Sequence, residues 1–234
     1  MLYVALGDSI TAGEAASAPQ FTYTHRLVKR LSATCQKSVC GEVLAEPGFT
    51  CQALQSAVLE NSSTVLSAAG TVTIWVGGDN LIDAALQSLS AVQNGLPAAA
   101  VRSKGGSLKQ TLATAVRHSI SGYSTSLETL VRHIRSVSKC RVVLCGQYNP
   151  FPNSPLATAA IGTLNQATAT IATSTGCAFA ATEQWFAGRE RELIAGYRNG
   201  RVEDVLSLHV PPVHPNDRGH QVIAEGLYPF VAPL

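Results

Sequence analysis

Two residues near opposite ends of the chain have the types that a nucleophile and its general base require. Ser9 lies in the segment Gly7–Gly13 (GDSITAG), directly after an apolar run that begins at Leu2. His214 lies in the sequence VHPN near the C-terminus. A serine hydroxyl attacks an acyl carbon when a histidine takes its proton, and this chemistry needs no cofactor. The two residues are therefore candidates for a nucleophile and its base.

The turn around Ser9 also suits the binding of an oxyanion. If Ser9 begins a helix, its own N–H points into the site and can stabilise negative charge. Asp8 and Ser9 are both good N-cap residues, so plain helix capping is the structural alternative. The phosphate-binding patterns G-x-G-x-x-G and G-x-x-x-x-G-K-[ST] are absent, as is the G-x-S-x-G elbow of α/β-hydrolases. A nucleotide-binding role is therefore the weakest of the hypotheses.

The sequence Gly7-Asp8-Ser9-Ile10 resembles the first signature block of the GDSL/SGNH hydrolases, which are flavodoxin-like α/β esterases and lipases. Glu46–Thr50 (EPGFT) is similar to the second block, and Gly48 stands where a glycine N–H serves the oxyanion hole. The segments 147–151 (QYNPF) and 216–224 also look like this family. The resemblance implies that Ser9 is the nucleophile and His214 the base.

The third block departs from the family pattern. Gly77–Asn80 (GGDN) resembles Gly-x-Asn-Asp with its last two residues transposed, and the resemblance implies an Asn amide as an oxyanion donor. An ionised Asp79 has no donor and repels the anion. Asn80 can supply the amide instead, or a protonated or averted Asp79 can leave the task to the N–H groups of Ser9 and Gly48. We favour Asn80, because the two glycines give the backbone freedom to adjust.

The block around the base departs as well. Pro211 stands where the resemblance implies an Asp that orients the imidazole of His214. The remaining candidates are Asp204 and the carbonyl groups of Pro211 or Pro212, since proline keeps its acceptor. We interpret the site as a Ser–His dyad or an atypical triad, oriented by a backbone carbonyl or by Asp204. Asp217 is expected to cap the last helix.

Substrate contacts are expected from Asp8, Tyr148 and Asn149, with a short-chain or acetyl ester as the substrate. Trp185-Phe186 fits a pocket wall and the core equally well. His209 is an alternative base, and His220 is expected at the surface or behind the site. The departures from the family also favour a second hypothesis, a catalytically impaired protein that binds a carbohydrate or acyl ligand. Acyl transfer to another alcohol would use the same residues.

The composition excludes several other classes of protein. The net charge is only +2 and charged residues make up 14% of the 234 residues, which argues against a nucleic-acid partner. No run of about 18 apolar residues predicts a transmembrane helix. The N-terminus lacks the features of a signal peptide, so we expect a cytoplasmic protein or a secreted mature form. The six cysteines show no zinc-ligand spacing, and we expect no metal or cofactor. A Cys35–Cys40 disulfide would need an oxidising compartment.

The elements that position these residues follow from the apolar runs. Strands are predicted at Leu2–Leu6, Val39–Leu44, Thr71–Val76, Arg141–Cys145 and Ala178–Ala181. Helices are predicted at Thr22–Leu31, Leu81–Val92, Ser107–Val137 (with a break near Gly122), Pro155–Thr173 and Asp217–Phe230, and a loop at Gly95–Gly106. Alternating strands and helices of these lengths predict one domain over residues 1–234, a three-layer α/β/α sandwich with a parallel sheet of about five strands. In such a sheet, ligands bind beyond the carboxyl ends of the strands.

Overall fold

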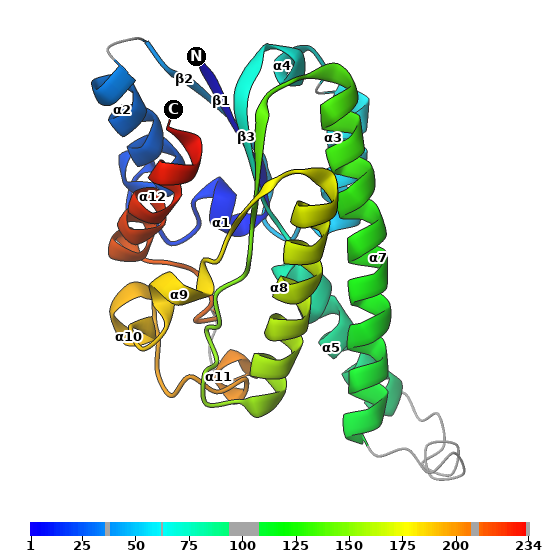
Figure 1. Ribbon diagram of the computed structural model, residues 1–234. Coiled ribbons are helices and arrows are strands. Elements are labelled where there is room, and N and C mark those ends of the chain that lie inside the picture. The colour runs from blue at the N-terminus through cyan, green and yellow to red at the C-terminus, as the bar shows by residue number, and fades with distance from the viewer. Residues whose placement is uncertain (36–37, 62, 94–107, 207–210, 233–234) are drawn as a thin grey trace.

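The computed structural model shows a parallel β-sheet between two layers of helices (Figure 1). It describes residues 1–35, 38–61, 63–93, 108–206 and 211–232. Within these residues the sheet has five strands in the order β2-β1-β3-β4-β5, and every neighbouring pair is parallel. The strands are β1 (Leu2–Gly7), β2 (Cys40–Ala45), β3 (Ala69–Trp75), β4 (Arg141–Cys145) and β5 (Ala178–Ala180). The predicted fold class and all five predicted strands are confirmed.

The central strand β1 shows why the strands are continuously apolar. Val4 and Leu6 pack into the hydrophobic core on one face of the sheet, whereas Tyr3 and Ala5 pack into the core on the other. All four side chains are buried, because successive residues of a strand point to opposite faces and both faces are covered. The sheet therefore fixes the position of the residues that follow its carboxyl end.

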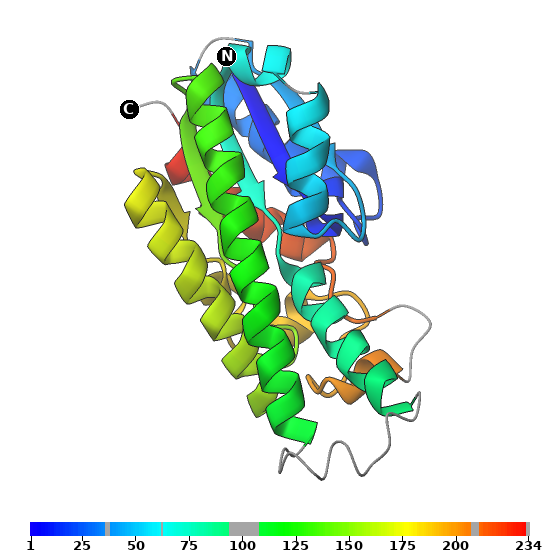
Figure 2. The same cartoon turned by 90° about the vertical axis from the view of Figure 1, so that its right-hand side faces the viewer.

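One face of the sheet carries the longest helices (Figure 2). Helix α7 (Leu108–Val137) runs along this face and contacts three other helices, α3 (Cys51–Asn61), α5 (Gly78–Gln93) and α8 (Pro155–Thr175). The short helix α4 (Ser63–Ala68) also packs against it. Figure 2 shows α5 and the first half of α7 extending beyond the carboxyl end of the sheet.

The other face is covered by the packed pair α2 (Tyr23–Cys35) and α12 (Asp217–Val231). Three one-turn helices precede α12 in the chain: α9 (Glu183–Phe186), α10 (Glu190–Leu193) and α11 (Glu203–Leu206). The remaining elements are the one-turn helix α1 (Ser9–Ala12) and the 3₁₀ turn η1 (Pro19–Phe21). Figure 1 shows that α12 brings the C-terminal part of the chain close to α1 and α2, near its beginning.

The structure differs from the predicted elements in a few places. Helices α3 and α4 follow β2, where no helix was predicted, and α7 continues through Gly122 without a break. At Gly122 the side chain of Gln52 on α3 comes so close that a Cβ atom would contact it. The predicted loop Gly95–Gly106 and His209 lie outside the described residues. Among the helices that are described, none is both long and apolar enough to cross a membrane.

Candidate active site

Ser9 lies at the carboxyl end of the central strand, as the first residue of α1. Asp8 is the N-cap, and its carboxylate accepts a hydrogen bond from the N–H of Ile10 at 3.1 Å. A Cβ atom at Gly7 would collide with the carbonyl oxygen of Trp75 and with Thr11, so glycine permits this close passage between β1 and β3. The turn thus holds Ser9 at the edge of the sheet, with only 9% of its surface exposed.

His214 reaches Ser9 from the far end of the chain. Its Nε2 atom lies 3.0 Å from the Ser9 hydroxyl oxygen, which is hydrogen-bond distance. Burial lowers the pKa of His214 below its usual value, and the negative charge of Glu14 partly opposes this shift. An imidazole that is neutral near pH 7 can accept the serine proton, so the pair has the geometry and the charge state of a nucleophile and its base.

The segment that carries His214 is fixed by backbone hydrogen bonds. The carbonyl of His214 accepts from the N–H of Ala195 at 2.9 Å, and the N–H of Asn216 donates to Leu193 at 2.9 Å. Tyr148, which follows β4, donates its hydroxyl hydrogen to the carbonyl of Val213. Its ring is stacked on Phe186 with a centroid separation of 4.0 Å. Hydrogen bonds at Val213, His214 and Asn216 therefore hold the base in place.

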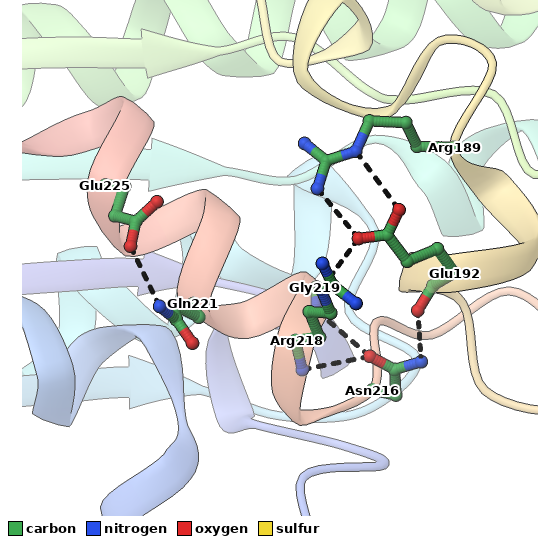
Figure 3. A network of polar contacts seen from close by, with 7 residues as sticks. All are labelled: Arg189, Glu192, Asn216, Arg218, Gly219, Gln221 and Glu225. Carbon is green, nitrogen blue, oxygen red and sulfur yellow. Dashed lines mark hydrogen bonds and ion pairs between the residues drawn. The ribbon is translucent and has the colours of Figure 1, made fainter.

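A polar network supports the same segment from α10 (Figure 3). The Glu192 carboxylate pairs with Arg189 at 2.9 Å and with Arg218 at 2.7 Å. The Asn216 amide donates to the Glu192 carbonyl at 2.9 Å, and its oxygen caps α12 by accepting from the N–H groups of Arg218 and Gly219. The network joins α10 to the start of α12, immediately after His214.

Among the described residues, no hydrogen bond joins His214 to Asp204, Pro211 or Pro212, the predicted orienting residues. The Asp204 carboxylate, on α11, accepts hydrogen bonds from the N–H and the side chain of Asn199 and from the N–H of Arg201. The Pro211 carbonyl accepts from the N–H of Val213 at 2.8 Å. Among the described residues, no hydrogen bond is formed at His214 Nδ1. Within the described residues, the His214 imidazole therefore forms hydrogen bonds only through Nε2.

A residue that the sequence analysis did not single out occupies that side. The Oε2 atom of Glu14 lies 2.9 Å from His214 Nε2, and 42% of the Glu14 side chain is exposed. The backbone carbonyl of Glu14 is bonded to the ring of His220, whose Nε2 lies 3.2 Å away. Because His220 Nδ1 accepts from the N–H of Tyr23, its Nε2 carries the hydrogen and donates it. Burial lowers the pKa of His220 to about 4, so this ring is neutral.

The predicted oxyanion residues other than Ser9 lie in different surroundings. Gly48 is exposed in the turn after β2 and has a φ of 84°, a conformation that favours glycine. Asn80 is buried, and its amide oxygen accepts from the N–H of Cys51 while its nitrogen donates to Gln52 at 2.8 Å. Its amide thus holds the start of α3, and one of its two N–H hydrogens is left for another acceptor.

Asp79 precedes Asn80 in the first turn of α5. Burial raises its pKa to about 6, with further contributions from the negative charges of Asp83 and Glu14. Burial likewise raises the pKa of Asp8 to about 8, and Asp79 and Glu14 act in the same direction. Near neutral pH, much of Asp8 is therefore protonated, and the site avoids part of the repulsion between its carboxylates.

The residues predicted to contact substrate are occupied by contacts within the protein. Asp8 is 2% exposed and caps α1, and Tyr148 is 3% exposed. Asn149 is half-buried, and its amide bonds to Thr158 at 2.9 Å and to the N–H of Phe151 at 2.8 Å. Tyr148 thus positions the base segment, and Asn149 shapes the loop after β4.

The described residues contain no cluster of three or more His, Cys, Asp and Glu side chains that could hold a metal ion. All six cysteines are free thiols in the structure, including Cys35 and Cys40, for which a disulfide was left open.

The chain is similar to known proteins over most of its length. A family model described as "GDSL-like Lipase/Acylhydrolase family" matches residues 5–222. Among curated proteins no sequence match is found. Similar solved structures include a lipase from a goat rumen metagenome, with 23% identity, a TM-score of 0.73, and coverage of 97% of this chain and 95% of that one. An acetylxylan esterase from Geobacillus stearothermophilus has 18% identity and a TM-score of 0.64, with coverage of 100% and 94%.

Proposed function

Since the chain belongs to the family of GDSL-like lipases and acylhydrolases and is thus a carboxylic ester hydrolase, we propose that Ser9 and His214 carry out the hydrolysis. The observation that carries this proposal is the 3.0 Å contact between the Ser9 hydroxyl oxygen and His214 Nε2. The two residues are 205 positions apart, so only the fold brings them together.

The reaction proceeds in two halves. His214 takes the Ser9 proton as the serine oxygen attacks the ester carbonyl, and then gives that proton to the leaving alcohol. A water molecule next attacks the acyl-serine, with His214 again as base, and frees the carboxylic acid. The Ser9 N–H at the start of α1, the Gly48 N–H and the remaining N–H of Asn80 are the donors that we assign to the oxyanion.

The imidazole is positioned chiefly by its backbone and its neighbours in this proposal. Tyr148 and the Ala195 N–H hold the carbonyl groups of Val213 and His214. A Ser–His dyad of this kind has no carboxylate on Nδ1 to stabilise the imidazolium. Glu14 stabilises it from the Nε2 side, because its negative charge raises the pKa of His214.

We propose short-chain esters, acetyl esters among them, as substrates. Both similar structures described above are named as ester-cleaving enzymes, and one is named an acetylxylan esterase. Within the described residues the side chains around the pair are largely committed to internal contacts. This arrangement favours a small acyl group over a long chain.

A second hypothesis is that the protein only binds an acyl or carbohydrate ligand, and it is favoured because no hydrogen bond is formed at His214 Nδ1 among the described residues. One experiment separates the two. Hydrolysis of p-nitrophenyl acetate, butyrate and octanoate is measured for the wild type and for Ser9→Ala. We expect a loss of activity in Ser9→Ala of at least about 10³-fold, and the highest kcat/KM for the shortest ester. Equal rates for the two proteins would reject Ser9 as the nucleophile.

A further inference from the structure

Two oxygen atoms compete for one nitrogen of the proposed base. His214 Nε2 lies 3.0 Å from the Ser9 hydroxyl oxygen and 2.9 Å from Glu14 Oε2. An ionised carboxylate can only accept hydrogen bonds, so its contact requires a hydrogen on Nε2. Activation of Ser9 requires the lone pair of the same atom. The contact with Glu14 and the activation of Ser9 therefore belong to different protonation states of His214.

The Glu14 carboxylate lies where the leaving alcohol must bind in the proposed reaction. After the attack of Ser9, the proton on Nε2 must pass to the oxygen of the leaving alcohol. That oxygen has to come within hydrogen-bond distance of Nε2, on the side that Ser9 does not take. In the free protein this is where the Glu14 carboxylate lies. A substrate must therefore move the carboxylate aside or give it another partner.

The backbone around Glu14 is fixed, whereas its carboxylate extends toward solvent. The next residue, Ala15, has a φ of 62°, which is rare for a residue other than glycine. The Glu14 carbonyl accepts from His220, and the N–H and hydroxyl of Ser17 both donate to the Asp217 carboxylate at the start of α12. These contacts hold the segment in place, while 42% of the Glu14 side chain remains exposed beside His214.

The Glu14 carboxylate lies near other acidic side chains. Asp79 and Asp83 lie on the first two turns of α5, and the charges of Asp83 and Glu14 both raise the pKa of Asp79. Asp79 and Glu14 in turn raise the pKa of Asp8, beside the nucleophile. A leaving group that approaches Nε2 therefore comes close to negatively charged side chains, among them those of Glu14 and Asp79.

From this geometry, and resting on the proposed function, we propose that Glu14 determines specificity for the alcohol part of the ester, favouring alcohols that carry an ammonium group. A cation two or three bonds from the ester oxygen pairs with the Glu14 carboxylate and draws it away from Nε2. The same step places the leaving oxygen beside the imidazolium. An anionic alcohol meets repulsion at the same point.

The test compares two acetate esters of the same shape, acetylcholine and 3,3-dimethylbutyl acetate, in which a neutral carbon replaces the quaternary nitrogen. The ratio of their kcat/KM values measures the preference for the cation. We expect the wild type to favour acetylcholine, and Glu14→Gln to lower the ratio by about two- to fivefold, as for loss of a partly exposed ion pair. Glu14→Asp keeps the charge on a side chain that is one methylene group shorter, so it should retain part of the preference for the cation.

The matched control is Glu128→Gln, on the exposed face of α7, where Glu128 pairs with Arg132. Its ratio stays at the wild-type value. An unchanged ratio in Glu14→Gln, with 3,3-dimethylbutyl acetate still hydrolysed, would overturn the role of Glu14 and leave the proposed function intact. Failure of the wild type to hydrolyse either ester, or the p-nitrophenyl esters, would overturn the proposed function, and this inference with it.

Discussion

On the nucleophile–base side of the proposed site, formed by Ser9, His214 and Glu14, two side chains reach the same imidazole nitrogen at 3.0 and 2.9 Å. On the oxyanion side, formed by Gly48 and Asn80, the Asn80 amide is bonded to the start of α3 instead. On the first side, Ser9 and Glu14 compete for this imidazole nitrogen in the free protein. On the second side, one group, the Asn80 amide, both stabilises the fold and takes part in the proposed chemistry. The two sides should therefore respond differently to substitution.

The largest effect is expected on the oxyanion side, from Asn80→Asp. The substitution keeps an acceptor for the N–H of Cys51, removes the amide donor and adds a negative charge. Loss of one oxyanion donor typically costs about 10²-fold in rate, so we expect kcat for p-nitrophenyl acetate to fall by about 10²-fold. Gln52→Ala is the control, because it removes only the bond within the protein, and it should change kcat by less than about threefold. A similar kcat in Asn80→Asp and Gln52→Ala would show that Asn80 has only a structural role.

A smaller effect is expected on the nucleophile–base side, from Tyr148→Phe. The change removes the hydroxyl that bonds to the Val213 carbonyl, while the ring keeps its stacking on Phe186. A small displacement of His214 should lower kcat by about tenfold and leave KM almost unchanged. Tyr228→Phe, on α12 against Arg30, is the control and should retain the wild-type kcat. If Tyr148→Phe also retains it, the backbone bonds alone hold the base.

Asp8, which precedes the nucleophile Ser9, contributes less to the stability of the folded protein as the pH rises. Asp8 has a pKa of about 8 in the folded protein, whereas an unfolded Asp titrates near 4. As the pH rises from about 4 to 8, the unfolded chain loses this proton before the folded protein does, so the contribution of Asp8 to stability falls. Asp8→Asn keeps the capping oxygen and removes the titration. We expect its Tm, relative to the wild type, to rise by at least a few degrees between pH 5 and pH 8.5. An equal difference in Tm at both pH values would contradict this.

The smallest effect on catalysis is expected from Asp204→Asn, outside both sides. The Asp204 carboxylate is bonded to Asn199 and Arg201. We expect kcat/KM for p-nitrophenyl acetate to change by less than about threefold. The loss of a true triad carboxylate can cost about 10⁴-fold in kcat. A fall approaching that size would make Asp204 the third member of a triad and replace the dyad proposed above.

The fold class and the strands were predicted correctly because their signal is local, whereas the catalytic roles of Ser9 and His214 stay predictions. The strands were identified because residues such as Val4 and Leu6 form continuous apolar runs that are buried on both faces of the sheet. Ser9 and His214 were singled out because each lies in a short motif next to a predictable element. Parallel strands then place the ends of these elements at one edge of the sheet.

The predictions failed where the determining contact is distant in sequence. The start of α3 is capped by Asn80, which lies 29 residues away, so no capping signal stands beside the helix itself. The position of Glu14 depends on the left-handed backbone of Ala15 and on His220, which is 206 residues away. For His220 the sequence left two positions open, at the surface or behind the site, and the structure places it behind the site, fully buried and bonded to the Glu14 carbonyl.

The central claim is that His214 activates Ser9, and covalent labelling tests it most directly. The wild type and His214→Ala are treated with a fluorophosphonate ester, which modifies an activated serine, and the site is located by peptide mass spectrometry. Our account predicts a single adduct on the peptide that contains Ser9 in the wild type, and labelling at least about 10³-fold slower in His214→Ala. An adduct on another serine, or equal labelling rates in the two proteins, would contradict it.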